Sequence, residues 1–110
     1  MHIGTEWNET AVGTDSGATA THAAEASSGG SGSRMHFVTS ISGHVDADSI
    51  ITIESPASTV LWQSKIDVSV EGFSFSFNVN VGGVPATAIL GKIASSSADC
   101  QVNINGYSIP

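Results

Sequence analysis

Residues 66–81, IDVSVEGFSFSFNVNV, decide the fold. Their second half alternates large apolar side chains with serine and asparagine, the apolar positions being Phe73, Phe75, Phe77, Val79 and Val81. A strict period of two predicts a β-strand with one buried face. Three phenylalanines on one strand supply a large share of the apolar surface that a small domain can bury. We therefore expect this strand in the middle of an all-β core.

The residues just before this strand alternate with the opposite parity, and the parity changes at Glu71-Gly72. A two-residue hairpin turn at these residues would explain the change. It would place three cross-strand pairs on one face, Val70–Phe73, Val68–Phe75 and Ile66–Phe77. Glu-Gly is a weaker turn dipeptide than Asn-Gly, because glutamate disfavours positive φ. The alternative is a bulge at Gly72 in one long strand, or a loose loop.

Composition bounds the classes of protein to which the chain can belong. The chain has 110 residues, of which 40% are hydrophobic and 12% are charged, so one patterned domain is expected and disorder is not. A net charge of −7 with three basic residues argues against binding to nucleic acid or to anionic membranes. The single cysteine, Cys100, excludes an internal disulfide and is expected to be buried. The N-terminus does not resemble a secretory signal, so we expect synthesis in a cytoplasm.

Residues 1–33 differ from the rest of the chain, because they contain acidic residues but no lysine or arginine. Their last seven residues, SSGGSGS, are typical of a flexible linker. We expect residues 1–33 to form a flexible or extended N-terminal arm on a core made by residues 34–110. The sizeable apolar side chains of this arm are Ile3, Trp7 and Val12. Trp7 could anchor the arm in a pocket on a neighbouring molecule, or it could be half exposed on a mobile terminus.

From Arg34 onward, short alternating segments are separated by turn residues at regular spacing. Six to eight such strands predict a small antiparallel β-sandwich or jelly-roll-like domain. A core of this size with few surface charges favours self-association, as a symmetric trimer or dimer. The predicted core side chains are Phe37, Ile41, Ile66, Val68, Val70, Phe73, Phe75, Phe77, Val79, Val102 and Ile104.

One group of residues has the composition of a metal site. His44, Asp46 and Asp48 would share one face of a strand, and a histidine with two carboxylates can bind a divalent ion. His36 is the obvious candidate for a fourth ligand. The same residues are also ordinary at a solvated strand end, which is the interpretation that we prefer. We therefore predict no metal and no cofactor.

Other polar residues give no catalytic pattern. The four histidines and many serines form no nucleophile elbow, and no glycine-rich loop opens a helix. We therefore predict that the protein is not an enzyme. The asparagines of two strands, at 78 and 80 and at 103 and 105, alternate on polar faces. They could be solvated, or they could line a sugar-binding surface with the help of Trp62 or Tyr107.

Residues 36–109 resemble small virion proteins of tailed bacteriophages. The likeness is carried by HFVTSISG at the start of this span, FSFSF in its middle and NINGYSI at its end. These segments are similar to capsid decoration, or cement, proteins. The resemblance implies a non-enzymatic protein, often trimeric, that bridges neighbouring major capsid proteins on the outer surface of the virion capsid. The main alternative is a receptor- or carbohydrate-binding module of a phage tail or spike.

Overall fold

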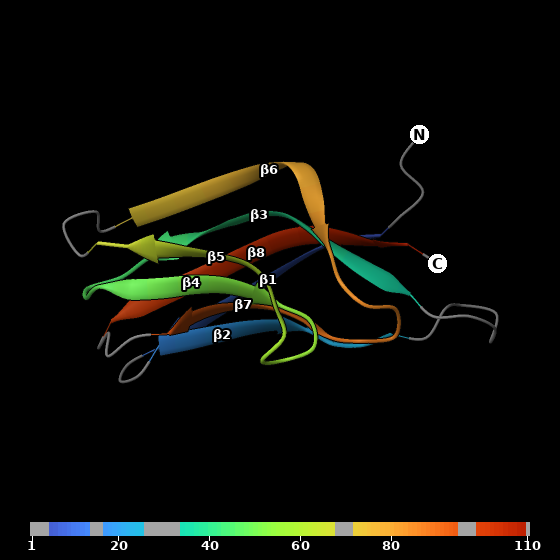
Figure 1. Ribbon diagram of the computed structural model, residues 1–110, viewed down its shortest axis with the longest axis horizontal. Coiled ribbons are helices and arrows are strands. Elements are labelled where there is room, and N and C mark those ends of the chain that lie inside the picture. The colour runs from blue at the N-terminus through green and yellow to red at the C-terminus, as the bar shows by residue number, and fades with distance from the viewer. Residues whose placement is uncertain (1–4, 14–16, 26–33, 68–71, 95–98, 110) are drawn as a thin grey trace.

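The structure is a computed structural model that describes residues 5–13, 17–25, 34–67, 72–94 and 99–109. These residues form eight strands (Figure 1). In chain order the strands are β1 (Thr5–Gly13), β2 (Gly17–His22), β3 (Met35–His44), β4 (Ser49–Glu54), β5 (Val60–Ile66), β6 (Gly72–Gly82), β7 (Ile89–Ala94) and β8 (Cys100–Ile109). Within the described ranges, no helix is long and apolar enough to cross a membrane.

The strands form two four-stranded antiparallel sheets that pack face to face. The first sheet has the order β1-β8-β3-β6 and the second has the order β2-β7-β4-β5 (Figure 1). The first strand pairs with the eighth, the second with the seventh, the third with the sixth and the fourth with the fifth. The chain is thus one long hairpin rolled into a sandwich, which is a jelly-roll arrangement. The predicted all-β fold is confirmed.

Much of the segment expected to be an arm belongs to the two sheets. β1 pairs with β8 along its whole length, from Thr5 opposite Ser108 to Gly13 opposite Cys100. β2 pairs with β7 in the same way. The expectation of a separate arm is therefore wrong for these two strands. Their alanines and threonines give no strong apolar pattern, but the backbone hydrogen bonds to β8 and β7 hold them in the fold. Residues 1–4, 14–16 and 26–33 of the expected arm lie outside the described residues.

The predicted hairpin at Glu71-Gly72 is wrong, and so is a single bulged strand. β5 pairs with β4 in the second sheet, whereas β6 pairs with β3 in the first. Ile66 accordingly lies opposite Ser49 and not opposite Phe77. β5 and β6 thus belong to different sheets, and Ile66 and Phe73, on either side of the change in parity, are both buried. Residues 68–71, with the predicted core valines at 68 and 70, lie outside the described residues.

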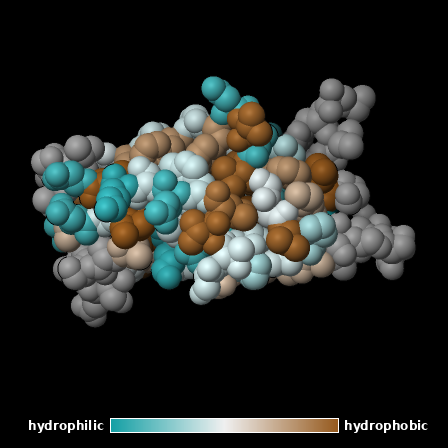
Figure 2. Space-filling view, viewed as in Figure 1, coloured by the Kyte–Doolittle hydropathy of each residue, from teal (hydrophilic) through white to brown (hydrophobic). Residues whose placement is uncertain are grey.

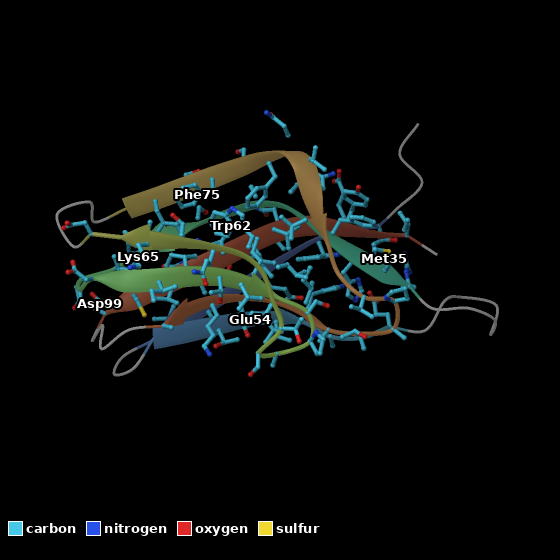
Figure 3. The ribbon with its side chains drawn as sticks, in the orientation of Figure 1. Met35, Glu54, Trp62, Lys65, Phe75 and Asp99 are labelled. Atoms are coloured by element: carbon cyan, nitrogen blue, oxygen red, sulfur yellow. The ribbon has the colours of Figure 1, made fainter. Side chains whose placement is uncertain are left out.

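The phenylalanine strand does face the interior, as its alternation predicts. Phe73 is buried, and Phe75 and Phe77 are partly buried against the core. Trp62, on β5 of the opposite sheet, packs edge-on against Phe75 and Phe77 with ring centroids 5.1 and 5.2 Å apart. Figure 3 shows Trp62 and Phe75 side by side between the two strands. This aromatic group joins β5 and β6, each of which is one of the two edge strands of its sheet.

An irregularity between β3 and β6 overturns two predicted core residues. Val38 pairs with Val81 and Ser40 with Ser76, so Thr39 alone faces the four residues 77–80. β6 bulges away from the sheet there, and Val79 is 85% exposed. β3 has its own irregularity at this point, because Val38 pairs with Gly106 and Ser40 with Asn105 on β8; Val38 is therefore buried and Phe37 lies on the outer face. There Phe37 stacks on Tyr107 at 5.1 Å.

The rest of the core is a layer of branched aliphatic side chains between the sheets. Ile41, Val102 and Ile104 of the first sheet are fully buried, and Ile66 is 7% exposed, as predicted. Cys100 is also buried, as expected. The second sheet contributes isoleucines that the sequence analysis did not single out, namely Ile51, Ile53, Ile89 and Ile93.

Candidate functional site

A cluster of two histidines, two glutamates, a serine and a tryptophan lies where β1, β2, β3 and β8 meet. We call it the His22–His36 cluster; its members are Trp7, Glu9, His22, Glu25, His36 and Ser108. The last residue of β2 and the second residue of β3 bring the two imidazoles together, in an edge-to-face contact at 4.5 Å. Since β2 and β3 belong to different sheets, the cluster closes one edge of the sandwich.

The Trp7 indole fits at this edge because the residue opposite it on β8 is a glycine, which leaves space for the ring. Trp7 pairs with Gly106 on β8, and a Cβ at Gly106 would stand 2.6 Å from the indole ring. The indole stacks on His22 at 4.2 Å, with an angle of 7° between the ring planes. Its Nε1–H donates a hydrogen bond of 2.9 Å to the Ser108 hydroxyl oxygen. Trp7 is thus anchored within its own chain, where the sequence analysis expected an anchor on a neighbouring molecule.

His36 is fully buried, and both of its ring nitrogens have partners. Nε2 lies 2.9 Å from the Ala23 carbonyl oxygen, which can only accept, so Nε2 carries the proton and donates. Nδ1 then accepts from the Ser108 hydroxyl at 2.5 Å. Hydrogen bonds therefore run in one direction from Trp7 through Ser108 and His36 to Ala23. Desolvation by burial lowers the pKa of His36 most; the nearby charges of His22 and Arg34 lower it further, against the raising effects of the Ala23 hydrogen bond and Glu25.

His22 lies between two carboxylates. Its Nδ1 is 2.8 Å from the Glu9 carboxylate and its Nε2 is 3.0 Å from the Glu25 carboxylate. The His22 side chain is only 16% exposed, whereas those of Glu9 and Glu25 are 36% and 42% exposed. A carboxylate on each ring nitrogen suits an imidazolium, or an imidazole that binds a cation through one nitrogen.

The cluster has the parts of a Ser-His-Glu arrangement but not its chemistry. Ser108 is 1% exposed and His36 is 0% exposed, so no substrate can reach the hydroxyl. The carboxylate of Glu25 is 3.9 Å from His36 Nε2, and the nearer partner of that nitrogen is a backbone carbonyl. A nucleophile must meet a substrate carbon while its base is held by a third group. The buried pair therefore lacks the access to substrate that a nucleophile and its base require.

The cluster does offer a set of metal ligands. One ligand atom from each of His22, Glu25 and His36 lies within 4.8 Å of the other two. His22 Nε2 is 3.0 Å and His36 Nε2 is 3.9 Å from the same oxygen of Glu25. Two imidazoles with one carboxylate form a donor set that suits first-row transition metals and Zn²⁺.

The metal group weighed from the sequence does not assemble. His36 and His44 lie at opposite ends of β3, roughly 26 Å apart at the usual rise of a strand. Figure 3 shows Met35, next to His36, at one end of the molecule and Asp99 near the other. The His44 ring is 3.9 Å from the Asp99 carboxylate. Asp46 and Asp48 follow the strand in an exposed bend, in agreement with the preferred interpretation of a solvated strand end.

Two other candidate residues of the expected arm have different outcomes. Val12 lies on β1 with 66% of its surface exposed, so it remains available to a partner. Ile3 lies outside the described residues. The sequence analysis missed the roles of His22, Glu25, Glu9 and Ser108. The one local signal is the His22–Glu25 spacing of three residues, because the other contacts join residues 11 to 101 positions apart.

Searches of protein-family models, of curated proteins and of solved structures found no match to this chain.

Proposed function

We propose that the chain is a non-enzymatic structural protein of a phage virion. It decorates the outer surface of the capsid, as a homotrimer, and bridges neighbouring major capsid proteins. The observation that carries this proposal is the distribution of exposed apolar side chains over the edge strands. Val12 on β1, Val60 and Leu61 on β5 and Val79 on β6 are 38–85% exposed, and each of these strands is at the edge of a sheet.

Edge strands with apolar side chains are typical of surfaces that bind other proteins. Ile50 on β4, next to β5, is also exposed, at 39%. Figure 2 shows apolar side chains gathered near the middle of one face of the molecule, with hydrophilic side chains toward one end. The net charge of −7 makes copies of the chain repel one another, so the exposed apolar side chains are the feature that supports association with protein surfaces.

The segments that resemble decoration proteins are neighbours in the fold. HFVTSISG lies in β3, FSFSF in β6 and NINGYSI in β8, and the order β8-β3-β6 makes them contiguous in the first sheet. A jelly roll is also a fold of viral capsid proteins, which agrees with the proposal by analogy alone. A protein that binds only the assembled shell stabilises that shell by mass action.

The test is cryo-electron microscopy of undecorated phage shells incubated with the purified protein. We expect regular density at the quasi-threefold positions, and a mass in solution of three chains by light scattering. The variant Val12→Glu should reduce shell occupancy at least tenfold. Thr19→Glu, which places the same charge on an exposed position of β2, is the matched control and should bind as the native chain does. A bare shell would refute the proposal.

A second candidate function rests on the outer face of the first sheet. Asn8 donates a hydrogen bond of 2.7 Å to Asn105 there, and Asn105 donates one of 3.2 Å to the Ser40 hydroxyl. Asn103 accepts one of 2.8 Å from the Thr10 hydroxyl. Tyr107 adds an aromatic ring beside Phe37 and accepts a hydrogen bond from Asn80. Trp62, the other aromatic considered, points inward and is not part of this face.

Amides, hydroxyls and an aromatic ring are the groups that bind sugars, and jelly rolls occur in lectins. A glycan-array measurement with the native chain separates this candidate from the decoration protein. Specific glycan binding that is lost in Tyr107→Ala, on a chain that leaves shells bare, would favour the carbohydrate-binding module.

A further inference from the structure

The His22–His36 cluster has a geometry that a small cation would complete. In a tetrahedral zinc site, with metal–ligand bonds of about 2.0–2.2 Å, the ligand atoms are about 3.4 Å apart. The two distances to the Glu25 oxygen, 3.0 and 3.9 Å, lie on either side of this value. All three ligand atoms are within 4.8 Å of one another, so the imidazoles need to approach by at most about 1.4 Å.

The second ring nitrogen of each histidine already has the partner that a metal-bound histidine needs. His22 Nδ1 faces the Glu9 carboxylate at 2.8 Å, and His36 Nδ1 faces the Ser108 hydroxyl at 2.5 Å. Metal-binding histidines usually donate their other N–H to a carboxylate, a carbonyl or another oxygen, which fixes the ring and raises its basicity. Both rings are therefore oriented with Nε2 toward Glu25.

Binding would change the tautomer of His36 and would break two hydrogen bonds, the one that the Ala23 carbonyl oxygen accepts and the one that the Ser108 hydroxyl donates. Nε2 would release the Ala23 carbonyl and give its lone pair to the ion, and the proton would move to Nδ1. The Ser108 oxygen can accept from His36 Nδ1 and from Trp7 Nε1 at once, because a hydroxyl has two lone pairs. The stacked indole of Trp7 keeps His22 in place.

The chemistry of the donors selects the ion. Two imidazole nitrogens and one carboxylate favour Zn²⁺ over Mg²⁺ and Ca²⁺, which prefer oxygen ligands. The two carboxylates, Glu9 and Glu25, balance the charge of a divalent ion. The Glu25 side chain is 42% exposed, so water has access to the fourth position.

We propose that His22, Glu25 and His36 bind one Zn²⁺ ion, with Glu9 and Ser108 holding the two imidazoles. The ion would fasten the end of β2 and the residues after it to β3, and so join the two sheets at the edge opposite the Trp62 aromatic group. This inference concerns a structural site and does not depend on the proposed function.

The experiment uses the full chain without a polyhistidine tag, after removal of metals with a chelator. Titration with zinc chloride in a calorimeter should give one ion per chain, and Zn²⁺ should raise the melting temperature where Mg²⁺ does not. Co²⁺ in place of Zn²⁺ should give the visible absorption of a four-coordinate ion. No heat of binding, or equal effects of Zn²⁺ and Mg²⁺, would overturn the proposal.

Substitutions inside and outside the cluster test whether the ion binds at the proposed ligands. Glu25→Gln, at a side chain that is 42% exposed, should bind Zn²⁺ at least tenfold more weakly, and Glu9→Gln should weaken binding about 10- to 100-fold. His44→Ala is the control, because it removes an exposed histidine at the far end of β3 and should bind Zn²⁺ as the native chain does. Native affinity in Glu25→Gln, or lost affinity in His44→Ala, would place the ion elsewhere and refute the assignment.

Discussion

At the scale of the residue, the Glu54 side chain stabilises the connection between β4 and β5 by hydrogen bonds. Glu54 is 5% exposed. Its carboxylate accepts hydrogen bonds of 2.7 Å from the Thr52 hydroxyl and from the Ser58 backbone N–H. Desolvation alone would raise the pKa of Glu54. The two hydrogen bonds and the positive charge of Lys92 outweigh desolvation, so the pKa is lowered below its ordinary value of 4.5.

This environment predicts a pH-dependent contribution to stability. A lowered pKa means that the contribution is fully present above the ordinary value and is lost as the pH falls through the folded value. Glu54→Gln, which cannot accept both hydrogen bonds, should reduce the free energy of unfolding by about 1–2 kcal/mol at neutral pH. In urea titrations the difference between native chain and variant should shrink in acid. A difference that is independent of pH would contradict this account.

At the scale of the element, the apolar alternation of β6 is regular in the sequence, but a bulge interrupts its pairing with β3 in the structure. Val79 and Val81 occupy equivalent positions in the alternation, but Val79 is 85% exposed on the bulge and Val81 packs partly buried against the core. The bulge arises because Thr39 alone faces residues 77–80. An alternation assigns a side chain to a face only while both strands keep their register.

We therefore expect opposite outcomes from the same substitution at these two positions. Val79→Ser should change the free energy of unfolding by less than about 0.5 kcal/mol, as exposed sites do. Val81→Ser should cost roughly 1–2 kcal/mol, because it removes buried apolar surface. Urea denaturation of both variants at the same low protein concentration measures the difference. Equal losses would mean that the bulge does not exist in solution.

At the scale of the whole molecule, the first two strands close the jelly roll. β1 pairs with β8 at the edge of the first sheet, and β2 pairs with β7 at the edge of the second. Ala18 and Ala20 of β2 are buried, and Trp7 of β1 packs against the core. The N-terminal segment is thus a component of the domain.

A chain that lacks residues 2–22 should consequently fail to fold. The deletion removes an edge strand from each sheet and bares the hydrogen-bonding edges of β7 and β8, which promotes aggregation. We expect no cooperative unfolding transition by circular dichroism, where the full chain shows one. A soluble truncated chain that unfolds cooperatively would restore the interpretation of residues 1–33 as an arm.

The sequence by itself determined the fold class and much of the core. The period of two predicted strands, and it placed Ile41, Phe73, Val102 and Ile104 in the interior because alternation reports which face of a sheet a side chain occupies. It did not determine which strands pair, so the crossing between β5 and β6 was predicted as a hairpin. It also failed at the bulge, where Phe37 and Val79 left the predicted face.

Only the tertiary structure decided that the N-terminal segment forms two strands of the sandwich, and which residues make up the His22–His36 cluster. Alanine and threonine strands carry a weak apolar signal, and their order comes from backbone pairing with strands at the other end of the chain. The Trp7–Ser108 hydrogen bond joins residues 101 positions apart, and the His36–Ser108 bond joins residues 72 positions apart. Such contacts leave no local pattern, because they arise when the rolled hairpin brings the two ends of the chain together.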